Sequence, residues 1–261
     1  MYRQSFSQLP QVIKNLLIIN GLFFLATISL ESLGINLVQL FGLHPFQSHD
    51  FMPHQLITHL FMHGDFTHLF FNMFALWMFG KILENVWGGK RFLTYYIITG
   101  LGAMILYSIV QQIQINLIEV KMTVEQIQQV SSQQGYDCYR ELVKLNKIGQ
   151  GLTDYGYSQY GIIGEEMKSL LFLYNTPVLG ASGAVFGILL AFGMLFPNTL
   201  LYIYFAIPVK AKYVVLGYGL LELFLTITSS NDGIAHLAHI GGMIFGFFLI
   251  KYWNKNTNSF Y

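Results

Sequence analysis

Six apolar stretches, each almost free of charged side chains, are distributed along the 261 residues of the chain. They cover residues 15–30, 67–79, 92–110, 177–197, 213–228 and 234–250. A helix needs about 20 mostly apolar residues to cross the hydrocarbon core of a bilayer. Only 10% of the residues are charged, where about 25% is usual in soluble domains. The sequence therefore predicts an all-α, polytopic membrane protein built as a bundle of six transmembrane helices.

The positions of the basic residues predict how this bundle is oriented. With the N-terminus in the cytoplasm, most of the 14 Lys and Arg residues fall in cytoplasmic segments. The others lie in one long external segment, and loops of that length translocate largely regardless of charge. We therefore expect a multi-pass protein of a bacterial plasma (inner) membrane with both termini in the cytoplasm.

Two segments exceed what a minimal six-helix bundle needs. Residues 33–63 are apolar yet contain five histidines, so we expect them to fold onto the bundle at the outer membrane surface. Residues 111–168 are rich in Gln, Tyr, Gly and charge. We interpret them as an external, partly helical insert between the third and fourth helices of one membrane domain, 1–261, and expect the insert to be dispensable for the chemistry.

The fourth stretch contains a serine among small residues, in the run Gly180-Ala181-Ser182-Gly183. Its hydroxyl is sterically open, and its N–H belongs to the first turn of the helix, where amides lack intrahelical partners. Such amides can donate to a developing oxyanion at the positive end of the helix dipole. Small residues also let membrane helices pack closely, and for this motif alone close packing is the stronger interpretation.

The sixth stretch places His239 near two glycines, Gly242 and Gly246, that are four residues apart. Residues with this spacing share a helix face, and a similar pair, Gly183 and Gly187, lies on the fourth stretch. Facing glycine stripes would let the two backbones approach closely. A short serine side chain could then reach an imidazole, as nucleophilic catalysis requires.

Under the predicted orientation the second, fourth and sixth stretches all enter the bilayer from outside. Ser182 and His239 then lie at similar depth, and we expect them to be about 2.6–3.2 Å apart, or somewhat further without substrate. His68 and Asn72, on the second stretch, share one helix face in the same outer layer. Both could donate to an oxyanion. Capping a loop or binding water explains this pair equally well when it is taken alone.

Taken in order, these motifs resemble the rhomboid family of intramembrane serine proteases. The resemblance rests on His68-x-x-x-Asn72, Gly180-x-Ser182-Gly183 and Ala238-His239-x-x-Gly242-x-x-x-Gly246, and it covers the bundle apart from the insert. It implies that Ser182 is the nucleophile and that His239 is the general base and acid. It also implies an oxyanion hole made by the Ser182 amide, His68 and Asn72. The family uses a dyad without a carboxylate, and we expect no Asp or Glu in this outer layer.

Two positions depart from the family pattern. Phe186 stands where many members have a Tyr stacked on the base, and its ring can still stack, so we expect activity to survive. Many members also have a Trp-Arg pair in the first external loop. The comparable residues 52–55 lack it, which leaves open how this loop is anchored.

Other polar residues have simpler interpretations. Glu222, the only acidic residue well inside a stretch, is expected to bond to another helix, with a proton path as the alternative. We expect His236 to face a loop or water, and Glu84 to lie on a solvated surface. His59 and His63 have a spacing that can bind metal, but no helpful carboxylate or Cys is near them in sequence. No H-E-x-x-H motif occurs, so we expect no metal.

The sequence thus predicts an endopeptidase that cleaves transmembrane protein substrates near the outer membrane surface, with no cofactor. The family resemblance implies substrate entry beside the fifth helix, past residues 229–233. A catalytically inactive relative that binds membrane proteins is the alternative, and a small-solute channel is a third possibility. The net charge of +1 gives no basic footprint for nucleic acid, and the single Cys138 excludes an internal disulfide. The oligomeric state stays unknown.

Overall fold

All six predicted stretches are helices in the computed structural model, which describes residues 9–147, 150–203, 206–228 and 233–256. They are α1 (Gln11–Glu31), the continuous α4 (Phe66–Ala75), η2 (Leu76–Gly80) and α5 (Lys81–Trp87), then α6 (Gly89–Glu119), α11 (Ser182–Leu195), α12 (Ala211–Thr228) and α13 (Gly233–Asn256). Among the described residues, four helices are long and apolar enough to cross a membrane: α1, α4–α5, α6 and α12. The helix α11 is apolar but shorter. The polytopic helical fold is therefore confirmed.

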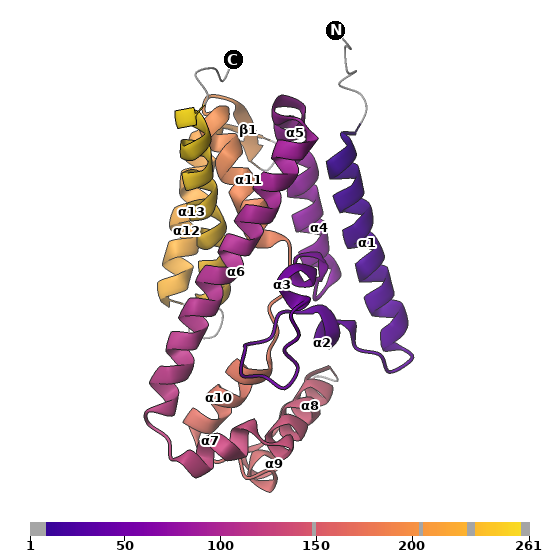
Figure 1. Ribbon diagram of the computed structural model, residues 1–261, viewed down its shortest axis with the longest axis vertical. Helices are drawn as coiled ribbons and strands as arrows, with labels where there is room; N and C mark the ends of the chain where they lie inside the picture. Colours follow the sequence, from indigo (N-terminus) through magenta and orange to yellow (C-terminus); the bar gives the residue numbers. More distant parts are fainter. Residues whose placement is uncertain (1–8, 148–149, 204–205, 229–232, 257–261) are drawn as a thin grey trace.

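The beginning of α1 and the end of α13 lie at the same end of the molecule (Figure 1). The helices α4, α11 and α13 all run toward this end, so their first turns lie at the opposite side of the bundle (Figure 1). This arrangement brings the N-terminal parts of the three helices, which carry the candidate residues, into one layer (Figure 1).

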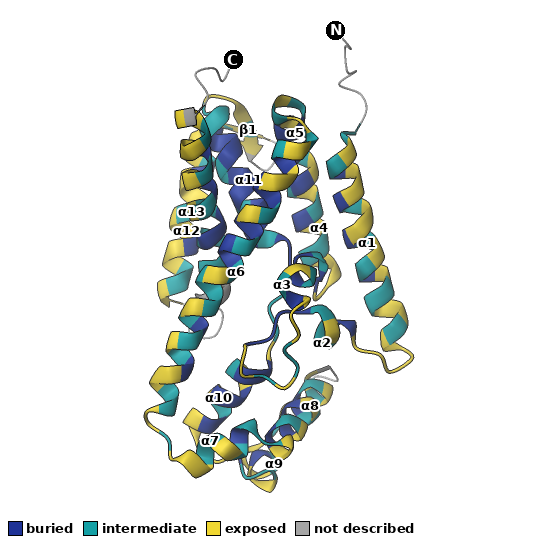
Figure 2. Cartoon of the chain, viewed as in Figure 1, coloured by how far each residue is buried: buried dark blue, intermediate teal, exposed yellow. Residues whose placement is uncertain are grey.

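The short helix α11 is the centre of the bundle. It contacts α4, η2, α5, α6, α12 and α13, and most of its length is buried (Figure 2). By contrast, α1 and α12 expose apolar side chains such as Leu25 (62%) and Ile227 (76%). Exposed apolar surface of this extent is what a lipid-facing helix requires. An apolar helix that lies inside the bundle can be shorter than its neighbours because lipid does not surround it.

Glycines set the contacts between α6, α11 and α13, although not in the way that the sequence predicted. A Cβ at Gly183 would lie 2.4 Å from Ala103 Cβ, and one at Gly187 would lie 2.7 Å from Thr99 Cβ, so this stripe faces α6. The expectation that the stripe faces the sixth helix was therefore wrong for Gly187, whereas Gly183 adjoins α13 as well, since its Cβ would lie 3.6 Å from the Ala238 carbonyl oxygen. The close approach to α13 depends on Gly242, whose Cβ would lie 1.9 Å from the Gly183 carbonyl oxygen.

Gly246 faces α6 rather than α11, because a Cβ there would lie 2.2 Å from the Tyr95 hydroxyl. Tyr95 in turn donates to the Gly187 carbonyl at 2.9 Å. The three helices therefore pack against one another through small residues, with α6 as the shared partner. Such close packing is a usual source of helix association in membranes.

Glu84 was expected on a solvated surface, and that expectation was wrong. The residue is only 6% exposed. Its carboxylate accepts hydrogen bonds from the Val12 and Ile13 amides, at 2.9 and 2.8 Å. These amides belong to the first turn of α1, which has no intrahelical partners for them and carries the positive end of the dipole. Glu84 thereby fixes α1 to α5.

The 33–63 segment folds onto the bundle, as expected, and forms α2 (Leu37–Phe41), α3 (Gln55–Thr58) and η1 (His59–Phe61). Gln55 is completely buried. Its side-chain oxygen accepts from the His44 amide at 3.2 Å, and its Nε2 donates to the Asp50 carbonyl at 2.7 Å. The His59 Nδ1 bonds to the Gln55 carbonyl at 2.8 Å. Gln55 and His59 therefore stabilise the internal fold of this segment, which lacks the Trp-Arg pair.

Helices also fill the 111–168 insert. After the extended α6 come α7 (Val124–Ser131), α8 (Gln133–Lys147), α9 (Asp154–Gln159) and α10 (Glu165–Asn175), grouped beyond one end of the bundle (Figure 1). They enclose a second apolar core that includes Cys138, Leu142 and Leu170. The insert touches the 33–63 segment, where the His49 Nε2 lies 2.7 Å from the Ser131 carbonyl.

A small antiparallel hairpin joins α11 to α12. Its strands are β1 (Leu200–Ile203) and β2 (Ile207–Lys210). This hairpin is an addition to the helical fold and lies at the end of the bundle where α13 also ends (Figure 1).

Candidate active site

Ser182 is the first residue of α11, and the backbone before it is held by the 33–63 segment. Val178 exchanges two backbone hydrogen bonds with Leu43, at 2.9 and 2.8 Å, and the Gly180 amide donates to the His59 carbonyl at 2.9 Å. Gly180 has φ +118°, a region that favours glycine. Ser182 itself is only partly buried. Ser182 is therefore not sealed in the core of the bundle, and its N–H lies in the first turn, as the sequence predicted.

His68 packs directly against this turn. A Cβ on Gly180 would lie 2.7 Å from His68 Nε2, so only glycine admits the ring at this distance. The Asp65 side chain caps the helix by accepting from the His68 amide at 2.8 Å. The structure thus brings together three of the predicted residues: Gly180, Ser182 and His68.

Asn72 is buried on the same helix, and its Nδ2 donates to the His68 carbonyl at 3.0 Å. An Asn amide nitrogen carries two hydrogens, so a second donor remains. No interaction of Asn72 with α11 is recorded among the described residues. Its place in the oxyanion hole therefore stays a prediction.

His239 lies on α13 against the ring of Phe186. The two rings are parallel, with their centroids 4.3 Å apart and an interplanar angle of 5°. The expected stacking is confirmed, so a hydroxyl-free ring holds the imidazole plane. Ser182 and Phe186 are four residues apart on α11 and share one face. The imidazole consequently lies along the face of α11 that carries the serine.

A direct hydrogen bond between Ser182 and His239 was expected, and the described part of the chain contains none. The neighbouring backbones nevertheless touch, since a Cβ on Gly183 would lie 3.6 Å from the Ala238 carbonyl oxygen. Catalytic hydrogen bonds are often long without substrate and shorten in the bound complex. The structure therefore places the two residues on adjoining backbone without a formed bond.

An acidic residue accompanies His239, against expectation. The Glu222 Oε2 of α12 lies 3.0 Å from His239 Nδ1 and 2.7 Å from His236 Nδ1. The interpretations that no carboxylate shares this layer and that His236 faces a loop or water were therefore wrong. The expected helix–helix hydrogen bond of Glu222 is confirmed. The sequence contained one signal for this shared contact. His236 and His239 are three residues apart and share a helix face, so both could meet the same partner.

Burial lowers the pKa of His59 to about 4, and burial together with the nearby His68 lowers the pKa of His63 to about 4. These two rings are therefore neutral near pH 7. His63 packs edge to face on His68, with ring centroids 4.9 Å apart. Among the described residues, the group that could hold a metal is instead Glu222, His236 and His239, whose ligand atoms lie within 4.8 Å of one another.

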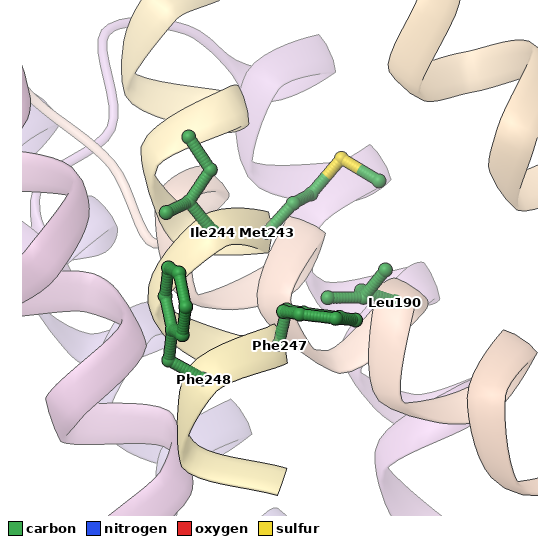
Figure 3. A pocket seen from close by; sticks show the side chains of 5 residues that line it. All are labelled: Leu190, Met243, Ile244, Phe247 and Phe248. Carbon is green, nitrogen blue, oxygen red and sulfur yellow. The ribbon is translucent and has the colours of Figure 1, made fainter. Parts of the chain in front are cut away.

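One hollow in the described surface is purely apolar. Leu190, Met243, Ile244, Phe247 and Phe248 line it, and Figure 3 shows only carbon and sulfur in these side chains. Met243 follows His239 by four residues, or about 6 Å along the helix axis. The hollow contains none of the predicted site residues, and without a polar group it suits a hydrocarbon chain rather than chemistry.

Comparison with known proteins agrees with this geometry. Residues 50–115 and 146–255 match the family model described as Rhomboid domain, and residues 116–145 of the insert lie outside the match. A similar protein, the Arabidopsis thaliana "RHOMBOID-like protein 12, mitochondrial", is 29% identical over 187 residues, which are 71% of this chain and 42% of that protein. The chain therefore matches less than half of this relative's length. Since the family model matches well over half of the present chain, the protein belongs to the rhomboid family.

Proposed function

We propose that this protein is an intramembrane serine endopeptidase that cleaves transmembrane protein substrates near the outer membrane surface. One observation carries the proposal. His239 is stacked on Phe186, which lies one turn after Ser182 on the same face of α11. A base whose ring plane is fixed beside a partly exposed serine is the arrangement that nucleophilic catalysis needs.

The chemistry follows from the roles of these groups. His239 Nε2 accepts the Ser182 Oγ proton as Oγ bonds to the scissile carbonyl carbon. The carbonyl π electrons move to oxygen, and the Ser182 amide, His68 and the free Asn72 N–H donate to this oxyanion. His239 then returns the proton to the leaving amine as the C–N bond breaks. Water repeats the sequence to release the acyl group, and no cofactor is required.

Co-expression with a single-span test substrate examines this proposal. We expect cleavage with the wild type and with a control, Ser29→Ala, in which an exposed serine of α1 is replaced. We expect at least a 10³-fold loss with Ser182→Ala and with His239→Ala, as for other members of catalytic dyads and triads. Cleavage that persists unchanged in Ser182→Ala would refute the assignment.

A catalytically inactive membrane-protein binding factor is the second candidate. The observation in its favour is that the described residues include no hydrogen bond between Ser182 and His239. A fluorophosphonate probe separates the two functions, because only an activated serine reacts at an appreciable rate. Labelling of the wild type that is lost in Ser182→Ala supports the protease. An unlabelled wild-type protein that still captures membrane proteins supports the binding factor.

The location and the partners complete the proposal. We infer a plasma (inner) membrane of a bacterial cell, with both chain termini in the cytoplasm and the insert outside. The partners are the lipid bilayer and single-span substrates, with no nucleic acid. Substrates would enter beside α12; the adjoining residues 229–232 lie outside the described part of the chain. The insert, residues 111–168, would take no part in the chemistry.

A further inference from the structure

Glu222 is a buried carboxylate in an apolar helix. It is 6% exposed, although α12 around it exposes Leu220, Leu221 and Leu223. Acidic side chains inside membrane helices are expensive and need compensating partners. The same carboxylate oxygen lies 3.0 Å from His239 Nδ1 and 2.7 Å from His236 Nδ1. The carboxylate therefore has two partners, and one of them is the base of the proposed reaction.

The bond to Glu222 determines which nitrogen of His239 carries the proton. A neutral imidazole has one N–H donor and one acceptor nitrogen. Because a carboxylate accepts, Nδ1 must be the donor, and Nε2 is left with its lone pair. A base that removes the serine proton needs this tautomer. Phe186 fixes the plane of the ring and Glu222 fixes its rotation within that plane.

We propose that Glu222 is a positioning residue for His239, so that the site works as a Ser182–His239–Glu222 triad. This inference rests on the proposed function. When the Ser182 Oγ proton moves to Nε2, the imidazole becomes positively charged, and the adjacent carboxylate stabilises that charge. The carboxylate stays unprotonated and forms no covalent bond. The proton then leaves with the amine, which returns His239 to its starting tautomer.

His236 has a supporting part in this arrangement. Its Nδ1 donates to the same Oε2, and its ring lies edge-on to that of His239, with centroids 6.1 Å apart. The bond holds the Glu222 side chain in the rotamer that also reaches His239. His236 has no stacking ring comparable to Phe186 among the described residues. We therefore assign the role of base to His239 and that of a second tether to His236.

A metal ion is the competing interpretation of these three residues. One carboxylate and two imidazoles are ligands that zinc uses in proteins, and the ligand atoms lie within 4.8 Å of one another. However, contacts of 2.7 and 3.0 Å are ordinary lengths for a charge-assisted hydrogen bond. A zinc ion here would also occupy the nitrogen that the triad needs for its N–H. Activity that a chelator abolishes and zinc restores would overturn the triad.

The test compares substitutions in the purified full-length protein, using the single-span substrate to measure kcat and KM. We expect Glu222→Gln to lower kcat about 100-fold with KM within about twofold, since general-base catalysis contributes about 10²–10⁴-fold. Glu222→Asp should recover at least tenfold of that loss, and His236→Gln should cost less than about fivefold. The matched control is Glu84→Gln. Glu84 is a carboxylate as buried as Glu222, but it accepts hydrogen bonds from backbone amides of α1. This substitution should lower the melting temperature and leave kcat unchanged.

Ring nitrogen NMR of ¹⁵N-histidine protein provides a readout that needs no activity. We expect the Nδ1-protonated tautomer for His239 in the wild type and a mixture in Glu222→Gln. A Glu222→Gln enzyme within threefold of the wild-type kcat, or a wild-type His239 protonated on Nε2, would overturn the triad. Ser182→Ala is measured in parallel. Cleavage that survives Ser182→Ala refutes the proposed function itself, whereas Ser182-dependent cleavage that survives Glu222→Gln refutes only the triad.

Discussion

Substituting Gly242 by alanine tests whether the contact between α11 and α13 determines the catalytic geometry. The added Cβ would lie 1.9 Å from the Gly183 carbonyl oxygen, 2.7 Å from its carbonyl carbon and 3.2 Å from its Cα. These atoms are backbone, so no side-chain rotation can relieve the overlap. The two helices must separate instead, and Gly183 is the residue after Ser182.

The magnitude follows from the size of the overlap. Real Cβ contacts are essentially never shorter than 3.0 Å and are ordinary from 3.4 Å, so α13 must move away from α11 by about 1–1.5 Å. Overpacking of this kind costs about 1–3 kcal/mol, and the gain in helix propensity on replacing Gly by Ala offsets about 1 kcal/mol. A displacement of about 1 Å at reacting groups lowers the rate about 10²-fold. We therefore expect a small loss of stability and a large loss of activity.

The assay measures kcat on the single-span substrate together with the melting temperature of the same preparation. The matched control is Gly217→Ala on α12, where a Cβ would meet nothing within 4 Å. The control should keep full activity and equal or slightly higher stability. If Gly242→Ala retained kcat within threefold while remaining folded, the α11–α13 contact would not set the position of His239 relative to Ser182, and this reasoning would fail.

Two further predictions concern the surroundings of the site. Burial lowers the pKa of His59 and His63 to about 4, whereas imidazoles in the unfolded chain protonate near pH 6.5. The two neutral rings therefore make their full contribution to the stability of the 33–63 segment above pH 6.5, and this contribution is lost as the pH falls toward 4. The loss should reach about 3 kcal/mol per histidine. Hydrogen exchange of the segment's amides measures this loss. Amide protection that does not change with pH would contradict the prediction. In the insert, Leu142→Ala should cost about 2–5 kcal/mol and expose the buried Cys138 to maleimide. Fluorophosphonate labelling of Ser182 should stay within about twofold, and a parallel loss of labelling would show that the insert supports the site.

The fold could be predicted from the sequence because membrane crossing depends on hydrophobicity summed over about 20 residues. This property is local, and neighbouring helices do not alter it. All six stretches are helices, and only their ends differ, as in α6, which continues to Glu119. The positions of Ser182 in a first turn and of Phe186 one turn later are also local. The stacking of Phe186 on His239 could be predicted because the motifs indicated that the fourth and sixth helices are neighbours.

Contacts of the polar residues with other parts of the chain were less predictable. Glu84 was taken for a surface residue because its sequence neighbours include Lys81, whereas the amides it binds belong to α1, more than 70 residues away. No pattern in the sequence indicated that Gln55 would hold the 33–63 segment together through its buried side chain. Hydrogen bonds between distant segments depend on which groups remain unpaired after the helices pack, and no local pattern records this.

Residue pattern alone was enough to infer the apolar helices and their order, which places His68, Ser182 and His239 in one layer with motifs that resemble the rhomboid family. The rotation of each helix about its own axis was known only from the packed bundle. That rotation turns the Gly183–Gly187 stripe toward α6 and brings Glu222 to His239. The physical reason is that periodicity defines the faces of a helix but not the neighbour that each face meets.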